Sequence, residues 1–330
     1  MSRLKPLPLH LQQLPFTVAQ ARRAGLTPAR TRSRDLWTPS REIRLPRSGS
    51  FELLESCRAH TSVTSSSFIS HITAAKIHGL FLPSRFEAAQ CLDVARPRGE
   101  SSPRRRHVNG RRLLLGPGDL VIVAGVPVTS VQRTLVDIAS LLTLDELVDI
   151  ADQIVCEHHS KCVPPKTAMV ERNALNAYIA EHAGARGMRK LLAAMEWVRV
   201  GSDSPPETRL RLVIARSPLP DFEPNVEILG PDGLALVAPD LANEEYKTCA
   251  EYDGNHHFTP EQQTKDHDRD FVTNSLGWHQ ALINRKDMQA GELILVTKLA
   301  RMLVRGGWPD PKNLAGQSLR GALNTRRDFQ

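Results

Sequence analysis

The chain has 330 residues, which suggests two or three domains rather than one. Its formal net charge of +7 and its sequence pI near 9.4 indicate an anionic partner such as a nucleic acid. No apolar run reaches the ~18–20 residues of a membrane-spanning helix, and the opening residues lack the pattern of a signal peptide. Five scattered cysteines form no disulfide framework. We therefore expect a cytoplasmic protein that has no membrane partner.

Positive charge is concentrated at the N-terminus, where residues 1–47 carry ten Lys and Arg against two acidic residues. Thr17 predicts the start of a helix that ends at Gly25, and a second helix is expected over residues 28–36. With the short β segment that follows, these parts predict a winged helix-turn-helix DNA-binding module over residues 1–48. The alternative is a helical hairpin whose arginines are only a solvated face. The DNA contacts expected from this module are Arg30, Arg32, Arg34 and Arg44.

Residues 49–160 are predicted to form a second, α+β domain. Its expected elements are a helix over 70–80, strands near 91–94, 112–115 and 120–123, and helices over 130–142 and 143–155. A Pro- and Gly-rich loop, RPRGESSPRRRH, separates the first two strands and either extends the basic surface or is simply mobile. The DNA contacts expected from this loop are Arg104, Arg105 and Arg106.

Four potential zinc ligands follow within seven residues, and they are Cys156, His158, His159 and Cys162. Structural zinc sites usually draw ligand pairs from two separated segments, and no second pair is visible in this sequence. A zinc site and an ordinary connecting loop therefore both remain open. Residues 161–201 are expected to form a helical connector to the C-terminal domain.

Residues 202–305 predict a mixed α/β domain with a small central sheet. Its expected elements are a helix beginning at Glu207, a hairpin formed by 226–229 and 234–242, a strand over 248–253, a polar helix over 260–276, a strand over 279–284 and a helix over 289–304. The tail, residues 306–330, is rich in Pro, Gly and Arg and is expected to be poorly ordered. The whole chain is thus predicted to be an α/β multidomain protein.

Carboxylates gather at the ends of two expected strands of this domain. Glu251 and Asp253 are two residues apart, so they project from the same face, and Asp240 comes alongside if the strands pair. Three carboxylates so close to one another favour the binding of a hard divalent cation, Mg²⁺ or Mn²⁺. His256 and His257 follow closely enough to carry protons or position water. The alternative is that the Asp-Gly step is an ordinary turn whose acids are merely solvated.

Several motifs follow one another in order through the last third of the chain. They are the SPPETRLR opening around Glu207, Pro239-Asp240, the EYDG step together with His257, and the segment from Asp266, Arg269 and Asp270 to Leu276 and Gly277. This series resembles the endonuclease domain of very-short-patch-repair proteins, a branch of the PD-(D/E)XK restriction-endonuclease superfamily. The resemblance covers residues 204–287 and implies a restriction-endonuclease-like fold.

The same resemblance implies metal-dependent hydrolysis of a DNA phosphodiester bond, with Mg²⁺ or Mn²⁺ as cofactor. Asp240 and Glu251 would hold the metal, with Asp253 as a further ligand, and Glu207 would complete its shell directly or through water. The superfamily usually has a lysine where this chain has Asp253, and very-short-patch-repair enzymes use histidine instead. The residues that could take over the role of that lysine are His257, His256 and Lys247, or a second metal held partly by Asp253.

Three segments at the front of the chain, FTVAQARRAGLT, SHITAAKIHGL and GVPVTSVQRTLVDIA, resemble AbiEi-like proteins over residues 16–157. These are the antitoxin and transcriptional-regulator components of type IV toxin–antitoxin systems, and actinobacterial proteins that fuse both parts are similar along nearly the whole chain. The sequence therefore predicts a metal-dependent DNA endonuclease guided by a DNA-binding module, in phage defence or DNA repair. The alternative is a non-catalytic DNA-binding regulator or antitoxin with a cognate toxin, and a third, weaker one is an RNA-directed nuclease.

Overall fold

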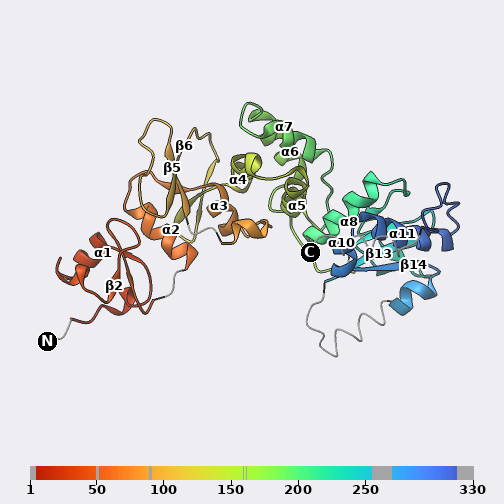
Figure 1. Cartoon of the computed structure of the whole chain (residues 1–330), viewed down its shortest axis with the longest axis horizontal. Coiled ribbons are helices and arrows are strands. Elements are labelled where there is room, and N and C mark those ends of the chain that lie inside the picture. Colours follow the sequence, from red (N-terminus) through yellow and green to blue (C-terminus); the bar gives the residue numbers. More distant parts are fainter. Residues whose placement is uncertain are drawn as a thin grey trace, which may run out of the picture. The chain divides into compact units, whose positions relative to one another are not determined.

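The computed structural model describes residues 5–49, 52–88, 91–158, 160, 162–254 and 270–317. The chain divides into two compact units (Figure 1), which we call the N-terminal and the C-terminal unit. The N-terminal unit comprises Met1–Leu142 with Ala177–Leu191, and the C-terminal unit comprises Thr143–Asn176 with Leu192–Gln330. The finer expected boundaries at residues 48, 160, 201 and 305 stay predictions.

The front of the N-terminal unit is a three-stranded antiparallel sheet with one α-helix. The strands lie in the order β1-β3-β2. Helix α1 begins after Thr17 as predicted, because the Thr17 side chain accepts from the Gln20 backbone while the Gln20 side chain accepts from the Thr17 backbone. Gly25 follows with a φ of +75°, which suits a helix C-terminus. The elements are η1 (Leu9–Leu11), β1 (Phe16–Thr17), α1 (Val18–Arg23), β2 (Leu36–Trp37) and β3 (Ile43–Pro46).

The prediction of a second helix over residues 28–36 is wrong. Only a single 3₁₀ turn, η2 (Arg30–Arg32), forms there, and Ser33 is already extended. The Ser33 hydroxyl donates to the Arg30 carbonyl, which takes up an acceptor that a continuing helix would need. The described front segment therefore has the capped first helix and the short strands of the predicted module but not its long basic helix.

The rest of the N-terminal unit is built on a five-stranded mixed sheet in the order β6-β5-β4-β8-β7. Its core joins Cys57 and Ala74 from two helices to Ile69, Val94 and Val128 from the sheet. The helix predicted over 70–80 is confirmed, whereas β4 and β8 were not predicted. The elements are α2 (Leu53–Ser62), β4 (Phe68–Ile69), α3 (His71–Ile77), η3 (Ser84–Phe86), β5 (Leu92–Pro97), β6 (Val108–Leu113), β7 (Leu120–Val123), β8 (Val126–Thr129), α4 (Val131–Ile138) and η4 (Ala139–Leu141). The boundaries between the two units fall within α6 (Arg172–Glu181) and α7 (Met188–Met195), so each unit contains part of both helices.

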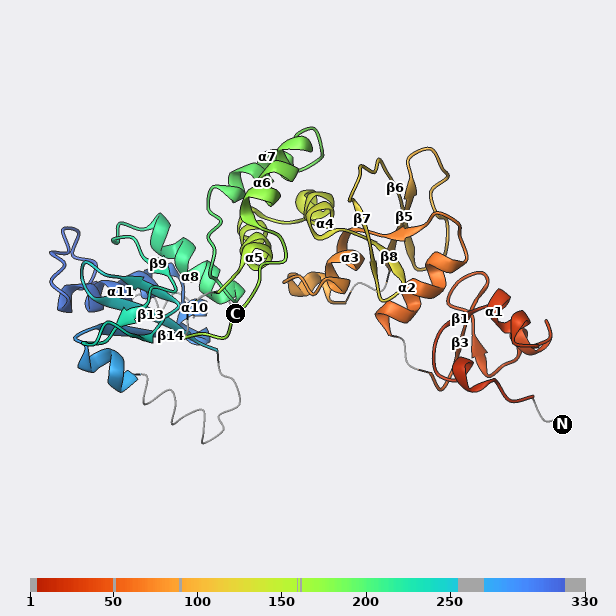
Figure 2. The ribbon, with the colours of Figure 1, turned by 180° about the vertical axis from the view of Figure 1, so that it is seen from behind.

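The C-terminal unit contains a four-stranded sheet in the order β14-β13-β12-β9. Strands β12 and β13 are antiparallel while β13 and β14 are parallel, so the small mixed sheet predicted here is confirmed. Helices α8 and α11 cover this sheet (Figure 2), and Leu210 and Leu299 pack from them onto Leu241, Ala250 and Ile283. The elements are α5 (Leu144–Val155), α8 (Pro205–Arg216), β9 (Glu223–Pro224), β10 (Ile228–Leu229), β11 (Ala235–Val237), β12 (Leu241–Asn243), β13 (Thr248–Asp253), β14 (His279–Asn284), α10 (Arg285–Ala290) and α11 (Glu292–Arg305).

Three expectations for this unit need correction. The run 234–242 is not one strand, because it breaks at Pro239-Asp240 into β11 and β12, which belong to different sheets. The last helix is interrupted at Gly291, where φ is +109°. Residues 306–317 are not poorly ordered, since Trp308 and Leu314 are buried in the core. Of the predicted polar helix, residues 270–275 are helical, and 260–269 lie outside the described residues, as do 318–330.

None of the helices in the described ranges offers an apolar length sufficient to span a bilayer.

Candidate functional site

Glu207 lies in the first turn of α8, where the helix start holds its carboxylate in place. Ser204 is the N-cap and Pro205 and Pro206 open the helix, a position that suits proline because no N–H is needed there. Glu207 accepts from the Asp203 backbone N–H at 2.7 Å and from the Ser204 hydroxyl at 2.6 Å. Burial and then the negative charge of nearby Asp240 raise the pKa of Glu207 to about 7.

Asp240 and Glu251 both adjoin the Leu241–Ala250 pair, which ends the β12–β13 ladder: Asp240 directly precedes Leu241, and Glu251 directly follows Ala250. The Asp240 carboxylate accepts from the Tyr252 backbone N–H at 2.7 Å, which fixes it against β13. Since Asp240 also interacts electrostatically with Glu207, the structure brings these two predicted site residues together beside the end of the strand that carries Glu251.

The other predicted members of this site are placed differently. Asp253 is exposed at the end of β13, opposite Asn284. His256 and His257 lie outside the described residues. Lys247 precedes the first residue of β13, so four residues of extended chain, about 13 Å, separate it from Glu251. Lys247 therefore does not stand where the superfamily lysine would be needed.

The carboxylates of Asp240, Glu251 and Glu207 could hold a divalent cation, because oxygen ligands suit Mg²⁺ and Mn²⁺. The raised pKa of Glu207 is the observation that fits, since a carboxyl destabilised by burial and a like charge is stabilised by a cation. Among the described residues, however, the oxygen atoms of these three carboxylates do not all lie within 4.8 Å of one another. The cation would have to draw them closer together.

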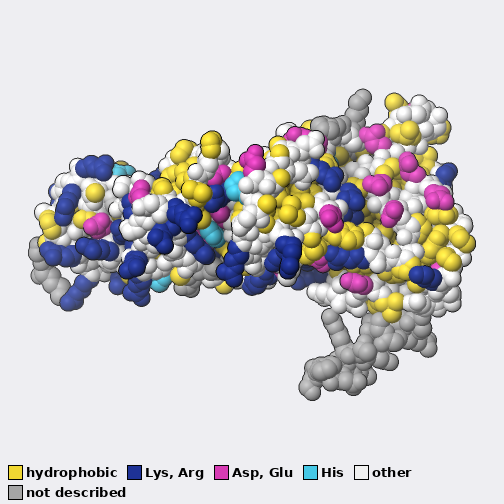
Figure 3. Space-filling view, turned by 90° about the horizontal axis from the view of Figure 1, so that it is seen from above, with side chains coloured by type: hydrophobic (Ala, Val, Ile, Leu, Met, Phe, Trp, Pro, Cys, Tyr) yellow, Lys and Arg dark blue, Asp and Glu magenta, His cyan; other side chains and the backbone are white. Residues whose placement is uncertain are grey.

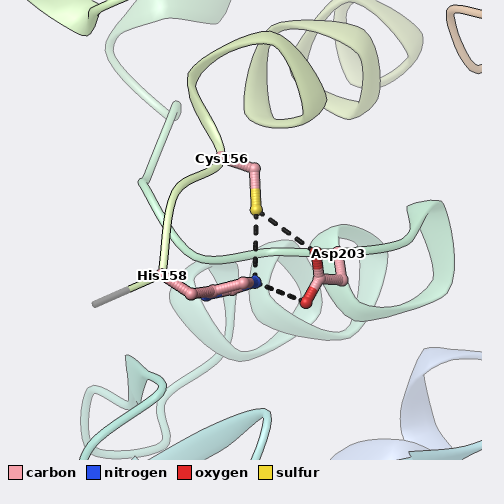
Figure 4. Close-up of side chains that lie close together, drawn as sticks. All are labelled: Cys156, His158 and Asp203. Carbon is pink, nitrogen blue, oxygen red and sulfur yellow. Dashed lines mark hydrogen bonds and ion pairs between the residues drawn. The ribbon is translucent and has the colours of Figure 1, made fainter. Parts of the chain in front are cut away.

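A tighter cluster of potential metal ligands joins the segment after α5 to Asp203, which lies just before α8 (Figure 4). Cys156, His158 and Asp203 form the one set of at least three His, Cys, Asp or Glu residues, among those described, whose ligand atoms all lie within 4.8 Å. His158 Nε2 is 2.6 Å from Asp203 Oδ2, Cys156 Sγ is 3.4 Å from Asp203 Oδ1, and Sγ and Nε2 are 3.7 Å apart. Lys166 adds an ion pair to Asp203 Oδ1 at 2.7 Å.

This cluster combines two of the potential zinc ligands in the sequence with a third that the sequence did not indicate. Cys162 does not belong to it, and His159 lies outside the described residues. Asp203 was missed because it is 45 residues away from His158 in the chain. No local spacing could have found it, since packing of the chain after α5 against the start of α8 brings the residues together.

The arrangement does not suit nucleophilic catalysis by Cys156. Burial and then the charge of Asp203 raise the pKa of the Cys156 thiol to about 11, so the reactive thiolate is disfavoured. A relay would also need His158 to use both ring nitrogens, one for the thiol and one for the acid. Here the same nitrogen, Nε2, faces both Cys156 and Asp203. The cluster is therefore better suited to binding than to acyl transfer.

Buried ion pairs tie α8, and with it Glu207, to α5. Asp152 accepts from Arg211 at 2.6 Å, from the Thr208 hydroxyl at 2.8 Å and from the Arg199 backbone at 2.8 Å. Asp152 and Arg211 are 1% and 5% exposed. Because both charges are shielded from water, removing or displacing either one would leave the other buried without a partner, which is strongly unfavourable. The carboxylate site thus starts from a rigidly positioned helix.

The predicted DNA contacts in the front segment separate into two kinds. Arg30 is 7% exposed and makes a bidentate ion pair with Asp35 and a bond to the Lys5 carbonyl. We therefore correct the prediction for Arg30, since its guanidinium is occupied in holding the fold. Arg44 bonds to the backbone of Thr31 and Ile43 and is half-buried. The residues that remain exposed for phosphate contact are Arg32 and Arg34.

The Arg-rich loop contributes to a basic hollow, a cavity of about 770 Å³ in the N-terminal unit. The arginines that line it are Arg41, Arg96, Arg104, Arg105 and Arg112. Arg105 also donates to the Arg41 carbonyl at 2.6 Å, so the loop is anchored rather than free. Arg106 is exposed beside it. The sequence alone did not indicate Arg41, Arg96 or Arg112 as part of this surface, because they come from separate segments.

Dark blue Lys and Arg side chains recur over the N-terminal unit, at the left of Figure 3, while acidic side chains are more frequent over the C-terminal unit. No model of a known protein family matches the chain, and no curated protein sequence is similar to it. The two resemblances therefore remain expectations, and a functional assignment has to rest on the residues of the site.

Proposed function

We propose that this chain is a metal-dependent DNA endonuclease-like protein whose N-terminal unit binds the nucleic acid. One observation carries the proposal: the half-buried Glu207 lies close enough to Asp240 for repulsion to help raise its pKa to about 7, beside the end of the strand that carries Glu251. A concentration of half-buried carboxylates is unfavourable in itself and is relieved by a divalent cation. Such clusters are characteristic of sites that perform chemistry.

In this proposal Asp240 and Glu251 hold Mg²⁺ or Mn²⁺, and Glu207 completes the set. The cation would supply charge stabilisation at the phosphate and a more acidic bound water. The role of the chain is positional: the Tyr252 N–H orients Asp240, and the Asp203 N–H and Ser204 hydroxyl orient Glu207. The basic hollow and the exposed arginines of the N-terminal unit would hold the phosphate backbone of duplex DNA.

The test is incubation of supercoiled plasmid with the full chain and Mg²⁺ or Mn²⁺. We expect nicking or linearisation by the wild type and loss of at least about 100-fold in rate for Asp240→Asn and Glu251→Gln. Asp221→Asn is the matched control, because Asp221 is an exposed acid of the same unit outside the site. Equal rates for all variants would show a contaminating nuclease, and no cleavage by any of them would remove the proposal.

A second function is favoured by one specific observation. Asp253 stands where the superfamily has lysine, and the nearest described lysine in sequence, Lys247, is at the other end of β13. A DNA-binding regulator or antitoxin with a non-catalytic nuclease-like domain would explain this. It predicts salt-sensitive, sequence-selective binding at its own promoter that Arg32→Ala weakens and Asp240→Asn leaves intact. Binding that is not sequence-selective would contradict it.

A further inference from the structure

We propose that Cys156, His158 and Asp203 bind one zinc ion that joins the segment after α5 to the start of α8. The site is separate from the carboxylates of Asp240 and Glu251 and does not rest on the proposed nuclease function. A thiol, an imidazole and a carboxylate are the three ligand types that Zn²⁺ takes in proteins. No other set of at least three potential ligands in the described ranges is so closely grouped.

The distances within the cluster fit a tetrahedral ion with little rearrangement. Typical zinc–ligand bonds place a sulfur and a nitrogen ligand about 3.6 Å apart, and a sulfur and an oxygen ligand about 3.5 Å apart. The observed separations from Cys156 Sγ are 3.7 Å to His158 Nε2 and 3.4 Å to Asp203 Oδ1. His158 Nε2 contacts the other oxygen, Asp203 Oδ2, at 2.6 Å, and this hydrogen bond would be replaced by coordination of both residues to the ion.

The surroundings of the three ligands also suit a bound cation. His158 Nδ1 lies 3.4 Å from Asn225 Nδ2, so an amide held by the Gly201 carbonyl stands at the position where zinc-binding histidines find an outer partner. Lys166 pairs with the same oxygen, Asp203 Oδ1, and because the Lys166 side chain is 36% exposed it can turn into solvent and release that oxygen to the metal. Cys156 and His158 are buried, whereas the side chain of Asp203 is 47% exposed, which leaves an entry path and a position for water as fourth ligand.

A zinc ion here would have a structural consequence for the neighbouring site. The Asp203 backbone N–H donates to Glu207, so fixing the Asp203 side chain also fixes one of the two donors that orient the Glu207 carboxylate. The ion would therefore link the segment after α5 to the start of α8, in addition to the ion pairs that already join these parts of the chain. Coordination also requires Cys156 as thiolate, so binding must release its proton.

The experiment is metal analysis of the full chain by mass spectrometry, followed by titration of the metal-stripped protein with Zn²⁺ and Co²⁺. We expect about one zinc per chain and a thiolate-to-cobalt charge-transfer band. Cys156→Ser and Asp203→Asn should each weaken zinc binding by at least about 100-fold, and Asn225→Ala by roughly tenfold. Cys162→Ser is the matched control and should bind as the wild type does, since Cys162 is outside the cluster.

Wild-type protein that contains no zinc and takes up none on titration would overturn the proposal, as would equal loss in Cys156→Ser and Cys162→Ser. Circular dichroism of each metal-stripped variant shows whether it folds. Asp203→Asn serves as the ligand test if Cys156→Ser does not fold, because Asp203 is half exposed. Glu207→Gln should keep its zinc while losing cleavage, which separates this proposal from the nuclease proposal.

Discussion

The two units of the molecule differ most in charge. The N-terminal unit carries 24 Lys and Arg against 10 Asp and Glu, a net charge of +14, whereas the C-terminal unit carries 19 against 26, a net charge of −7. The net charge of +7 for the whole chain hides this separation. A polyanion is therefore attracted by one unit and repelled by the other unless cations intervene. This difference matches the proposed function, in which one unit would bind nucleic acid and the other would bind metal.

The sharpest test of how the acidic unit is held together is Asp152→Ala. The variant leaves Arg211 buried without its carboxylate partner, and we expect a loss of about 3–5 kcal/mol in the free energy of unfolding. The matched control is Asp145→Ala, which breaks the largely exposed pair with Arg216 and should cost less than about 1 kcal/mol. Urea unfolding followed by tryptophan fluorescence is suitable because three of the four tryptophans, Trp197, Trp278 and Trp308, belong to this unit. Equal losses in both variants would contradict the structural account.

Metal binding should stabilise the acidic unit. At a hundred times the dissociation constant, Mg²⁺ or Mn²⁺ should add about 2.7 kcal/mol to the free energy of unfolding. Asp240→Asn should abolish this gain, and Asp221→Asn should keep it. The measurement is thermal unfolding with and without the metal, in the same tryptophan signal. Stabilisation that survives in Asp240→Asn would place the metal elsewhere, with the Cys156 cluster as the next candidate.

Removal of charge from the basic unit should change the salt dependence of DNA binding. Replacing Arg104, Arg105 and Arg106 by alanine should reduce the slope of log affinity against log salt by up to about 2.7, if each contacts one phosphate. The same measurement on Arg285→Ala with Lys286→Ala, an exposed basic pair of the acidic unit, should show no change. Fluorescence anisotropy with a labelled duplex at several salt concentrations gives both slopes. A larger effect in the control pair would reverse the division of labour between the units.

A smaller effect is expected from Gly110→Ala in the basic unit. A Cβ atom at Gly110 would overlap the Pro103 carbonyl oxygen, so the Arg-rich loop would have to move away from β6. We expect about 1–3 kcal/mol of destabilisation and weaker DNA binding with an unchanged salt slope. Gly99→Ala in the same loop is the control, because nothing lies within 4 Å of the added atom. Normal DNA binding by Gly110→Ala would show that the position of the loop is unimportant.

The smallest expected effect is a pH dependence in the acidic unit. Because the folded-state pKa of Glu207 is about 7, above its ordinary value of 4.5, stability is lost as the pH rises from about 4.5 to 7. Asp240→Asn removes one cause of that shift, so without metal the variant should gain stability over the wild type, on the order of 1 kcal/mol above pH 7. The gain should vanish near pH 4.5. Denaturant unfolding across this range in the presence of a chelator is the measurement, and a pH-independent difference would contradict it.

Sequence patterns correctly predicted the helices and strands whose formation depends on residues close together in the chain. Strand β13 was predicted with its observed ends, since its β-prone residues run directly into an Asp-Gly step, and α1 was predicted from the cap at Thr17. The helix over 28–36 failed because its outcome depends on Arg30 reaching Asp35 and on Ser33 bonding back to the chain. In the sequence, Arg30 and Arg32 look alike, yet one is buried and the other exposed.

The candidate site was predictable only in part for the same reason. The position of Asp240 alongside β13 follows from two adjacent strands, and the sequence anticipated it. The nearness of Glu207 to Asp240 could come only from a resemblance, because α8 precedes the sheet by many residues. The contribution of Asp203 to the Cys156 cluster had no sequence signal at all. Contacts between distant segments depend on packing, which no local spacing records.

The hydrogen bond from the Tyr252 N–H to the Asp240 side chain affects how an aspartate at this position should be interpreted in the sequences of related proteins. The chain breaks at Pro239-Asp240, and the carboxylate takes the place of the backbone carbonyl that would otherwise continue the ladder. Selection could therefore retain this aspartate for architecture alone, even in a lineage whose chemistry has been lost.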